Sequence, residues 1–155
     1  MKREEIIEHI LVVSKDDPVV STTGKASREV FEISGKNKEG NEKVFLTVGS
    51  IGHNSTIALG IAYNKPDTKI WCIDGDGAVL MHIGVMGIIG ATAPKNYVHI
   101  LINNGSHESV GWMPTVALDI DFVMIAKACG YKNSVSVENF EDLDKALMEA
   151  KKKMN

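Results

Sequence analysis

The chain alternates short β-branched runs with helical segments, and this order constrains its fold more than any other feature. The runs are apolar on both faces, which is typical of parallel strands covered by helices on both sides. We expect strands over residues 19–22, 44–48, 69–74, 97–103 and 134–137. Apolar residues at helical spacing predict helices over residues 3–14, 26–34, 53–63, 78–91, 121–129 and 139–153. The pattern predicts an α/β fold, with a doubly wound, mostly parallel sheet and helices on both faces.

Length and composition indicate an ordinary globular protein. The 155 residues are expected to form one domain over residues 1–155, and 44% of them are hydrophobic. The net charge of −3 gives no reason to expect nucleic acid or an anionic membrane as a partner. The longest apolar stretch, Ala78–Ala91, is shorter than the roughly 20 residues that a membrane span needs. Cys72 and Cys129 are interpreted as buried thiols, and no signal peptide is visible, so we expect a cytoplasmic location. Lys36–Lys43 (KNKEGNEK) is expected to be a solvated loop.

Three glycine-rich segments follow expected strands, at residues 48–60, 73–79 and 102–112. Ligands of open α/β sheets bind beyond the carboxyl ends of the strands. Glycines allow close backbone approach, and Asp76 with Asn103 or Asn104 offers the oxygen ligands that a hard cation needs. One helix and one return strand fit between Asp76 and the asparagines, which predicts that they lie on neighbouring strands. Each segment alone is typical of a turn, but the combination indicates a site for a cation and a phosphate group.

A Rossmann dinucleotide site is the obvious competitor, because GDGAVL begins like GxGxxG. Leu80 stands where the third glycine belongs. No Asp or Glu lies between Asp76 and Glu108, so the acidic ribose-binding residue expected about 20 residues on is missing. An aspartate in a phosphate loop would repel a diphosphate unless a cation lay between them. The presence of Asp76 in this loop therefore favours a site in which the carboxylate binds Mg²⁺ and the Mg²⁺ binds a diphosphate.

GDG followed after a helix and a strand by NN resembles the motif of thiamine-diphosphate enzymes, in their diphosphate-binding domain. The similarity extends to GSIG at residues 49–52 and covers about residues 3 to 150. Within these enzymes the chain looks like the family of phosphonopyruvate decarboxylase and the sulfopyruvate decarboxylase β subunit. The stretches that carry this narrower resemblance are TTGKASREVFEI, GSIGHNSTIALGIA, WCIDGDGAVLMHIGVMGIIG and APKNYVHILINNGSHESVG. The resemblance implies thiamine diphosphate and Mg²⁺ as cofactors.

The resemblance also implies which residues hold these cofactors. The cofactor-binding set comes from the strand-end segments and comprises Gly49, Ser50, Ile51, Gly52, Gly75, Asp76, Gly77, Ala78 and Asn104. Asp76 and Asn104 would bind Mg²⁺ through their side chains, and Ser106 through its carbonyl. Gly77 and Ala78 would offer backbone N–H groups to the diphosphate, and the family often has Ser in place of Ala78.

Two further roles are implied for the turn at residues 49–52. Ile51 would hold the cofactor bent, which brings its amino group near C2. The carbonyl of Gly49 would accept a hydrogen bond from that amino group. Both roles would prepare the cofactor for reaction.

The resemblance implies that a pyrimidine-binding domain is needed as well, and 155 residues leave no room for one. The chain is then a separate β subunit with an α partner, or the C-terminal half of a longer enzyme. The start MKREEII favours the subunit. We expect an oligomer that binds cofactor poorly and turns over little without the partner.

The expected reaction is decarboxylation of a small anionic 2-oxo acid, for which the cofactor supplies the electron sink. His107 and Glu108, just after the asparagine pair, are candidates for proton transfer. Lys25 and Arg28 are candidates for binding the phosphonate or sulfonate tail of the substrate, with His53 a weaker candidate.

Other residues in the apolar runs have structural interpretations. His82 and His99 are interpreted as core histidines whose ring nitrogens have hydrogen-bond partners. The segment Ala78–Ala91 is apolar almost all round and has Gly84, Gly87 and Gly90, which favours an oligomer interface over simple core burial.

Phosphonopyruvate is the expected substrate, and sulfopyruvate or another small 2-oxo acid is the alternative. A non-catalytic binding or assembly module with the same fold is the alternative of another class. The joint presence of Asp76, Asn104 and Ile51 counts against that module.

Overall fold

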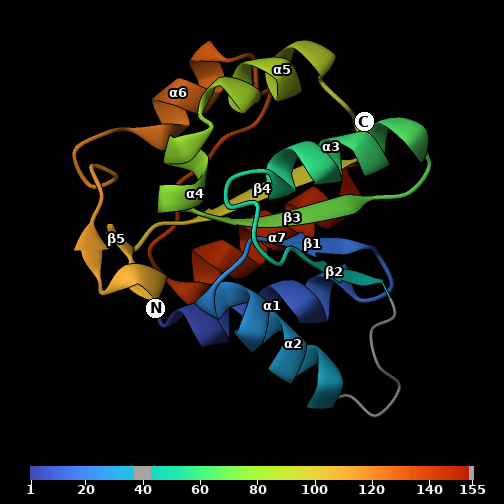
Figure 1. Ribbon diagram of the computed structural model, residues 1–155. Coiled ribbons are helices and arrows are strands. Elements are labelled where there is room, and N and C mark those ends of the chain that lie inside the picture. The colour runs from blue at the N-terminus through green and yellow to red at the C-terminus, as the bar shows by residue number, and fades with distance from the viewer. Residues whose placement is uncertain (37–42, 154–155) are drawn as a thin grey trace.

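The computed structural model describes residues 1–36 and 43–153, and its centre is a four-stranded parallel sheet (Figure 1). The strand order is β2-β1-β3-β4, and every neighbouring pair in it is parallel. The strands are β1 (Val19–Ser21), β2 (Val44–Leu46), β3 (Ile70–Gly75) and β4 (Tyr97–Ile102). These correspond to four of the five expected strands, so the predicted α/β fold with a mostly parallel sheet is confirmed. Most of the expected loop Lys36–Lys43 lies outside the described residues.

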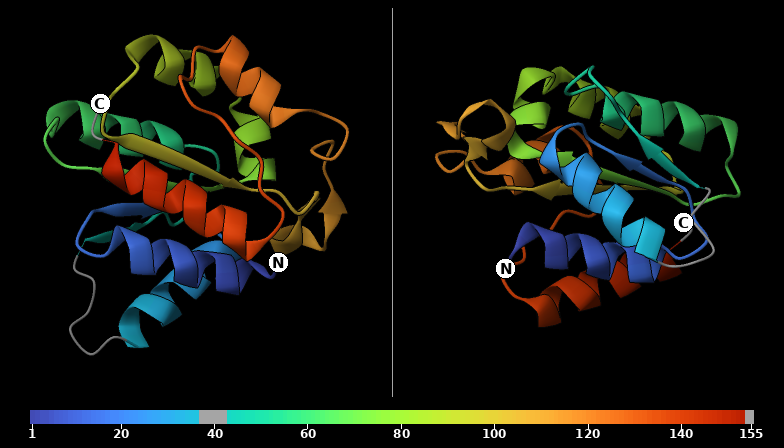
Figure 2. Two further views of the ribbon diagram at one scale, coloured as in Figure 1. Left: turned by 180° about the vertical axis from the view of Figure 1, so that it is seen from behind. Right: turned by 60° about the horizontal axis from the view of Figure 1, so that its bottom comes forward.

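Helices cover both faces of the sheet (Figure 2). One face carries α1 (Arg3–Ser14), α2 (Lys25–Lys36) and α7 (Phe140–Lys152). The other face carries α3 (Asn54–Asn64), α4 (Asp76–Met81), α5 (Gly84–Thr92) and α6 (Phe122–Ala128). This arrangement is the doubly wound architecture that the sequence predicts.

Alternating side chains of β3 explain why the sheet needs cover on both sides. Trp71 and Ile73 are fully buried in the core cluster with α1, α2 and α7. Ile70 and Cys72 are fully buried in the cluster on the α3 side. A strand apolar on both faces gains burial free energy from each helical layer, about 25 cal/mol per Å² of apolar surface.

Two expectations about the elements are wrong. The single helix expected over residues 78–91 is two helices, because His82 leaves the helical conformation (φ −135°, ψ 41°) between α4 and α5. The strand expected over residues 134–137 is not formed, although the structure describes these residues. That segment crosses from the face of α6 to the face of α7, and Val137 packs against the core without joining a ladder (Figure 2).

A short hairpin beyond the carboxyl edge of the sheet was not expected. It pairs β5 (Ser106–His107) with β6 (Met113–Pro114) in antiparallel register, and the 3₁₀ turn Glu108–Val110 follows β5. The Thr115 amide N–H donates to the Gly105 carbonyl at 2.9 Å, which fixes the hairpin on the loop after β4. The hairpin therefore adds a wall to the edge where the strands end.

The two cysteines agree only in part with the expectation of buried thiols. Cys72 is buried, Cys129 is partly buried, and both are free thiols. Among the described helices, none has both the length and the apolar character needed to cross a bilayer.

Gly90 is a site where helix packing forbids a side chain. A Cβ at Gly90 would lie 1.7 Å from the Cys129 carbonyl oxygen, so α5 approaches α6 backbone to backbone. The expected close approach at this glycine is thus made within the chain. A Cβ at Gly87 would meet no described atom within 4 Å.

We predict that Gly90→Ala lowers the free energy of unfolding by about 1 to 3 kcal/mol, because the helices must separate. Gly87→Ala is the matched control and should be neutral or stabilise by up to about 1 kcal/mol through helix propensity. Urea unfolding followed by circular dichroism measures both. Equal stabilities of the two variants would contradict the packing.

Candidate functional site at the carboxyl edge of the sheet

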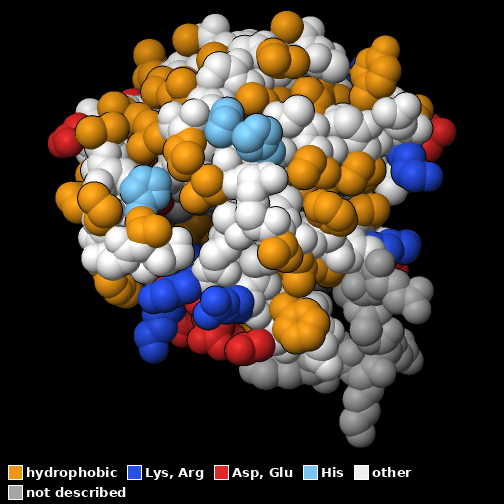
Figure 3. Space-filling model, in the orientation of Figure 1, with side chains coloured by type: hydrophobic (Ala, Val, Ile, Leu, Met, Phe, Trp, Pro, Cys, Tyr) orange, Lys and Arg blue, Asp and Glu red, His pale blue; other side chains and the backbone are white. Residues whose placement is uncertain are grey.

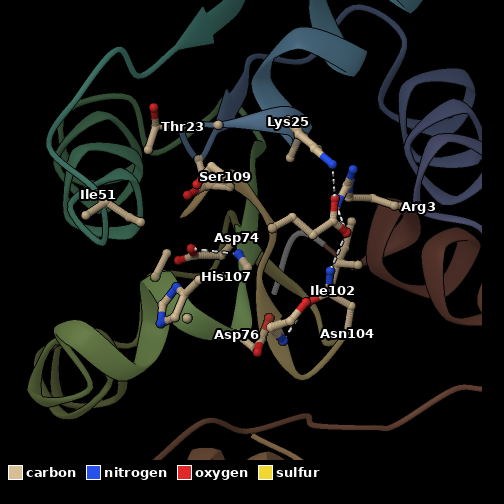
Figure 4. A pocket seen from close by; sticks show the side chains of 18 residues that line it. Arg3, Thr23, Lys25, Ile51, Asp74, Asp76, Ile102, Asn104, His107 and Ser109 are labelled. Carbon is tan, nitrogen blue, oxygen red and sulfur yellow. Dashed lines mark hydrogen bonds and ion pairs between the residues drawn. The ribbon is translucent and has the colours of Figure 1, made fainter. Parts of the chain in front are cut away.

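A pocket lies beyond the carboxyl ends of β1, β3 and β4, between α1, α2 and the hairpin (Figure 4). The structure brings most of the predicted site residues into its lining, namely Lys25, Ile51, Gly75, Asp76, Gly77, Ala78, Asn104, Ser106, His107 and Glu108. Gly49, Ser50 and Gly52 flank Ile51 in the turn before α3. Arg28 and His53 are exposed and lie outside the lining.

Pairing of β3 with β4 brings Asp76 close to the asparagines. Gly75 is opposite Ile102 in the parallel register, so Asp76 and Asn103 are the first residues after the ends of two neighbouring strands. Asp76 is 2% exposed, and the Thr115 hydroxyl donates to its Oδ2 at 2.6 Å. Thr115 was missed by sequence reasoning, because it belongs to the unexpected hairpin.

Both asparagines have hydrogen bonds at each end of the amide, but only Asn104 lines the pocket. Asn103 Nδ2 donates to the Ala117 carbonyl at 3.0 Å, and its Oδ1 accepts from the Gly105 amide at 3.1 Å. Asn103 thus uses both ends of its amide to hold the loop. Asn104 lines the pocket, where its Oδ1 accepts from the Ser106 amide at 3.1 Å.

A cluster of charged residues closes one side of the pocket, as Figure 4 shows near Arg3 and Lys25. Arg3 donates to Glu29 through Nε and Nη2, both at 2.7 Å, and to Glu108 Oε1 through Nη1 at 2.6 Å. Lys25 Nζ lies 3.2 Å from Glu108 Oε2 and 4.6 Å from the ring centre of Trp112.

The ion pairs change the acid–base properties of their members. The hydrogen bond from Arg3 holds the pKa of Glu108 below its usual value, and the hydrogen bond to Glu29 raises the pKa of Arg3. Glu108 is therefore an ionised carboxylate at neutral pH. Arg3 was missed because nothing near it in the sequence marks it as part of a site.

His107 lies against the backbone of Gly77. A Cβ at Gly77 would lie 2.2 Å from Cε1 of the imidazole, so a side chain there would displace the ring. His107 lines the pocket beside Asp76 and comes from β5. The glycine thus leaves room for the imidazole at the start of α4.

The turn at residues 49–52 has a left-handed backbone that suits glycine. Gly49 has φ 76°, Ser50 φ 48° and Gly52 φ 83°. A Cβ at Gly52 would lie 2.7 Å from the Ala78 carbonyl oxygen and 2.4 Å from His82 Nδ1. The turn is therefore packed directly on α4, and this contact places Ile51 in the pocket wall.

A buried polar network lies beneath the pocket. His99 bridges Asp74 and Tyr131, with Nε2 3.2 Å from Asp74 Oδ2 and Nδ1 3.0 Å from the Tyr131 hydroxyl. Cys72 Sγ is within 4.8 Å of the Asp74 and His99 ligand atoms. Burial raises the pKa of the Cys72 thiol well above its usual value, and Asn54 donates to it at 3.3 Å. A protonated, hydrogen-bonded thiol is a poor metal ligand, so we interpret this group as a structural network.

The two histidines of the apolar runs differ. His99 is a satisfied core histidine, as expected. His82 is half-buried, and its ring lies against that of His53 with centres 4.2 Å apart and planes tilted by 56°. Its Nδ1 is buried without a hydrogen-bond partner among the described residues, so the expectation of a satisfied histidine is wrong for His82.

The donor set of the pocket fits a hard cation with a bound anion. Carboxylate and amide oxygens from Asp76 and Asn104 are the ligands that Mg²⁺ prefers. Ser106 Oγ is a buried hydroxyl in the lining without a hydrogen-bond partner in the described part of the chain. The first N–H groups of α4 have no partner within the helix, which favours an anion near Gly77.

Two solved structures share the fold over nearly the whole chain. A thiamine diphosphate-dependent 4-hydroxybenzoylformate decarboxylase from Rhodococcus jostii has a TM-score of 0.81 at 19% identity, covering 99% of this chain and 31% of that chain. A benzoylformate decarboxylase from Polynucleobacter necessarius has a TM-score of 0.74 at 16% identity, covering 99% and 31%.

Curated relatives are more similar in sequence. A phosphonopyruvate decarboxylase from Streptomyces viridochromogenes is 37% identical over 145 residues, which are 93% of this chain and 35% of that protein. A sulfopyruvate decarboxylase subunit beta from Methanococcus maripaludis is 35% identical over 147 residues, 95% of this chain and 76% of that subunit. The chain spans about a third of the phosphonopyruvate decarboxylase.

The family model described as "Thiamine pyrophosphate enzyme, C-terminal TPP binding domain" matches residues 22–155. This match includes the turn before α3, the GDG segment and the NN segment. The cofactor of this family is thiamine diphosphate, with Mg²⁺ as its usual partner metal. The chain belongs to the thiamine pyrophosphate enzyme family, in which it corresponds to the C-terminal, TPP-binding domain.

Proposed function

We propose that residues 1–155 form one thiamine-diphosphate-binding domain, which acts as the β subunit or C-terminal half of a 2-oxo acid decarboxylase. The favoured substrate is phosphonopyruvate, which is converted to phosphonoacetaldehyde and CO₂. The observation that carries the proposal is the meeting of Asp76, Asn104 and Ser106 in one pocket, with Gly77 and Ile51 in its walls. The relatives named phosphonopyruvate decarboxylase support the choice of substrate.

Asp76 and Asn104 hold Mg²⁺ through side-chain oxygens, and Ser106 holds it through its carbonyl. Backbone N–H groups of Gly77 and Ala78 bind the diphosphate. When bound, thiamine diphosphate supplies the electron sink that decarboxylation of a 2-oxo acid requires. Each of these residues follows closely on the carboxyl end of β3 or β4, whose position is fixed by the sheet, which favours a preorganised site.

The turn before α3 orients the rest of the cofactor. Ile51 supports its bent form, and the Gly49 carbonyl accepts a hydrogen bond from its amino group. Ser50 and Gly52 shape the turn around these two residues, and Gly75 leads β3 into α4. The packing of Gly52 on α4 supports a fixed distance between the two halves of the site.

His107 is the residue proposed to transfer a proton, because its imidazole lines the pocket next to Asp76. Glu108 was predicted beside it, and its carboxylate already accepts from Arg3, Asn104 and Lys25. Lys25 binds the anionic tail of the substrate. Arg28 and His53 are weaker candidates, since both lie outside the pocket lining.

A partner that carries a pyrimidine-binding domain completes the site. The pocket encloses only about 80 Å³, well below the roughly 300 to 1,000 Å³ of complete ligand pockets. Large apolar side chains are exposed on α4, α5 and the hairpin region, where Figure 3 shows hydrophobic surface. They are Met81, Ile83, Ile88, Val110, Trp112, Met113, Val116 and Leu118. An apolar surface of this kind favours an oligomer interface.

Sulfopyruvate decarboxylation is the second candidate function. It is favoured by the sulfopyruvate decarboxylase β subunits, of whose length this chain covers about three quarters, against a third for the phosphonopyruvate decarboxylase. Both acids carry a tetrahedral anionic group, so one cationic side chain serves either substrate.

Isothermal titration with thiamine diphosphate and Mg²⁺ tests the proposal. We expect weak binding by the chain alone and tight binding with a co-expressed pyrimidine-binding subunit encoded beside it. Steady-state CO₂ release from phosphonopyruvate, sulfopyruvate and pyruvate then ranks the substrates. Absence of cofactor binding in both preparations would leave the non-catalytic module as the function.

The hydroxyl of Thr115 provides a second test, because it orients the Asp76 carboxylate. We predict that Thr115→Val weakens Mg²⁺-dependent binding of thiamine diphosphate by about 10- to 100-fold, the usual cost of losing an outer-shell hydrogen bond. Thr115→Ser keeps the hydroxyl and should bind nearly as tightly as the wild type. Unchanged affinity in the valine variant would remove Thr115 from the metal site.

The substrate role of Lys25 is tested with a substrate that lacks the anionic tail. Lys25→Gln should raise KM for phosphonopyruvate by about tenfold or more, the effect of losing a charge-assisted hydrogen bond, and change kcat/KM for pyruvate little. Arg28→Gln is the comparison and should have the smaller effect. A larger rise in KM for phosphonopyruvate with Arg28→Gln than with Lys25→Gln would refute this assignment. An equal loss of kcat/KM for phosphonopyruvate and for pyruvate with Lys25→Gln would also refute it.

A further inference from the structure

We propose that Glu108 is a positioning residue, which turns the amide oxygen of Asn104 toward the cation, and that Arg3 and Glu29 hold Glu108 in place. This inference rests on the proposed function, since it concerns the same metal site. It assigns a role to Arg3 and Glu29, which are far from the GDG and NN segments in the sequence.

The first step is the chemistry of an asparagine amide. An amide has an oxygen that accepts and an NH₂ group that donates, and it binds a cation only through the oxygen. Rotation by half a turn would exchange the two. Asn104 Nδ2 donates to Glu108 Oε1 at 2.6 Å, and an ionised carboxylate accepts hydrogen bonds only. Glu108 therefore holds the nitrogen on its own side, and the Ser106 amide N–H, which donates to Asn104 Oδ1 at 3.1 Å, holds the oxygen on the other side.

The second step is the support of Glu108 itself. Arg3 binds Glu29 of α2 with two parallel hydrogen bonds, a bidentate geometry that fixes the plane of the guanidinium. Its third nitrogen, Nη1, then points at Glu108 Oε1. The side chains of Arg3 and Glu108 are 18% and 12% exposed, so water competes little with this pair. Helices α1 and α2 thus fix the position of a carboxylate in the 3₁₀ turn after β5.

The third step is that one carboxylate oxygen of Glu108 accepts hydrogen bonds from both Arg3 and Asn104. Oε1 of Glu108 accepts from Arg3 and from Asn104, whereas Lys25 lies next to Oε2. The Glu108 carboxylate thus has three donors around it, which hold it in one orientation. Asp76 is held in a parallel way by Thr115, so each proposed side-chain ligand of the cation has an outer partner.

The test compares Glu108→Gln in two backgrounds, wild type and Asn104→Asp, with the chain assembled with its partner subunit. A glutamine can donate as well as accept, so the Asn104 nitrogen loses its fixed acceptor and only the Ser106 amide still holds the orientation of the side chain. An aspartate at 104 offers oxygens at both ends and needs no orientation, and its charge is repelled by Glu108. Mn²⁺ binding by electron paramagnetic resonance gives the metal affinity without turnover.

We expect Glu108→Gln to weaken Mn²⁺ binding by about tenfold in the wild-type background. In the Asn104→Asp background the same change should weaken Mn²⁺ binding much less, because a carboxylate at position 104 offers an oxygen to the cation whichever way it is turned. Glu32→Gln, an exposed change of the same charge on α2, is the matched control and should have no effect in either background. Thermal unfolding of each complex confirms that the variants are folded.

The outcomes separate this inference from the proposed function. A loss of equal size in both backgrounds would mean that Glu108 is merely structural, and no effect in the wild-type background would also overturn the inference. Failure of the wild-type complex to bind Mn²⁺ would overturn the proposed metal site and this inference with it.

Discussion

The parallel pairing of β3 with β4 is the contact on which the candidate site depends. Gly75 opposite Ile102 sets the register, so that the chain leaves both strands at the same edge and delivers Asp76 and Asn104 together. A slip of one residue would turn every side chain of the strand to the other face. Burial of β3 on both faces opposes such a slip, since four apolar side chains would have to change layers. The stability of the core and the geometry of the site therefore have the same cause.

The site is finished by residues that come from elsewhere in the chain. Thr115 orients Asp76 from the hairpin, and Arg3 reaches Glu108 from the start of α1. The turn around Gly52 packs on α4 and places Ile51. Strand ends supply the proposed ligands, and the surrounding helices and hairpin supply their orientation. Exposed apolar side chains on α4, α5 and the hairpin region agree with a site completed by another subunit.

Much of this could be predicted from the sequence, because the signals are local. Apolar runs gave four of the strands, and GDG with NN on adjacent strands indicated the pocket. His82, where α4 ends, lies against the turn at Gly52, and residues 134–137 connect α6 with α7 without joining the sheet. Arg3 and Thr115 act through contacts that only the folded chain creates. Sequence patterns show periodicity and motif spacing. Contacts between residues far apart in the sequence change neither, so they could not be predicted.

The central claim is that one divalent cation binds between the ends of β3 and β4. Anomalous diffraction from crystals of the assembled protein with Mn²⁺ and thiamine diphosphate measures this directly. The account predicts one strong peak within about 2.5 Å of a carboxylate oxygen of Asp76 and the amide oxygen of Asn104. A crystal with ordered cofactor and a Mn²⁺ peak elsewhere, for example beside Cys72, Asp74 and His99, would contradict it.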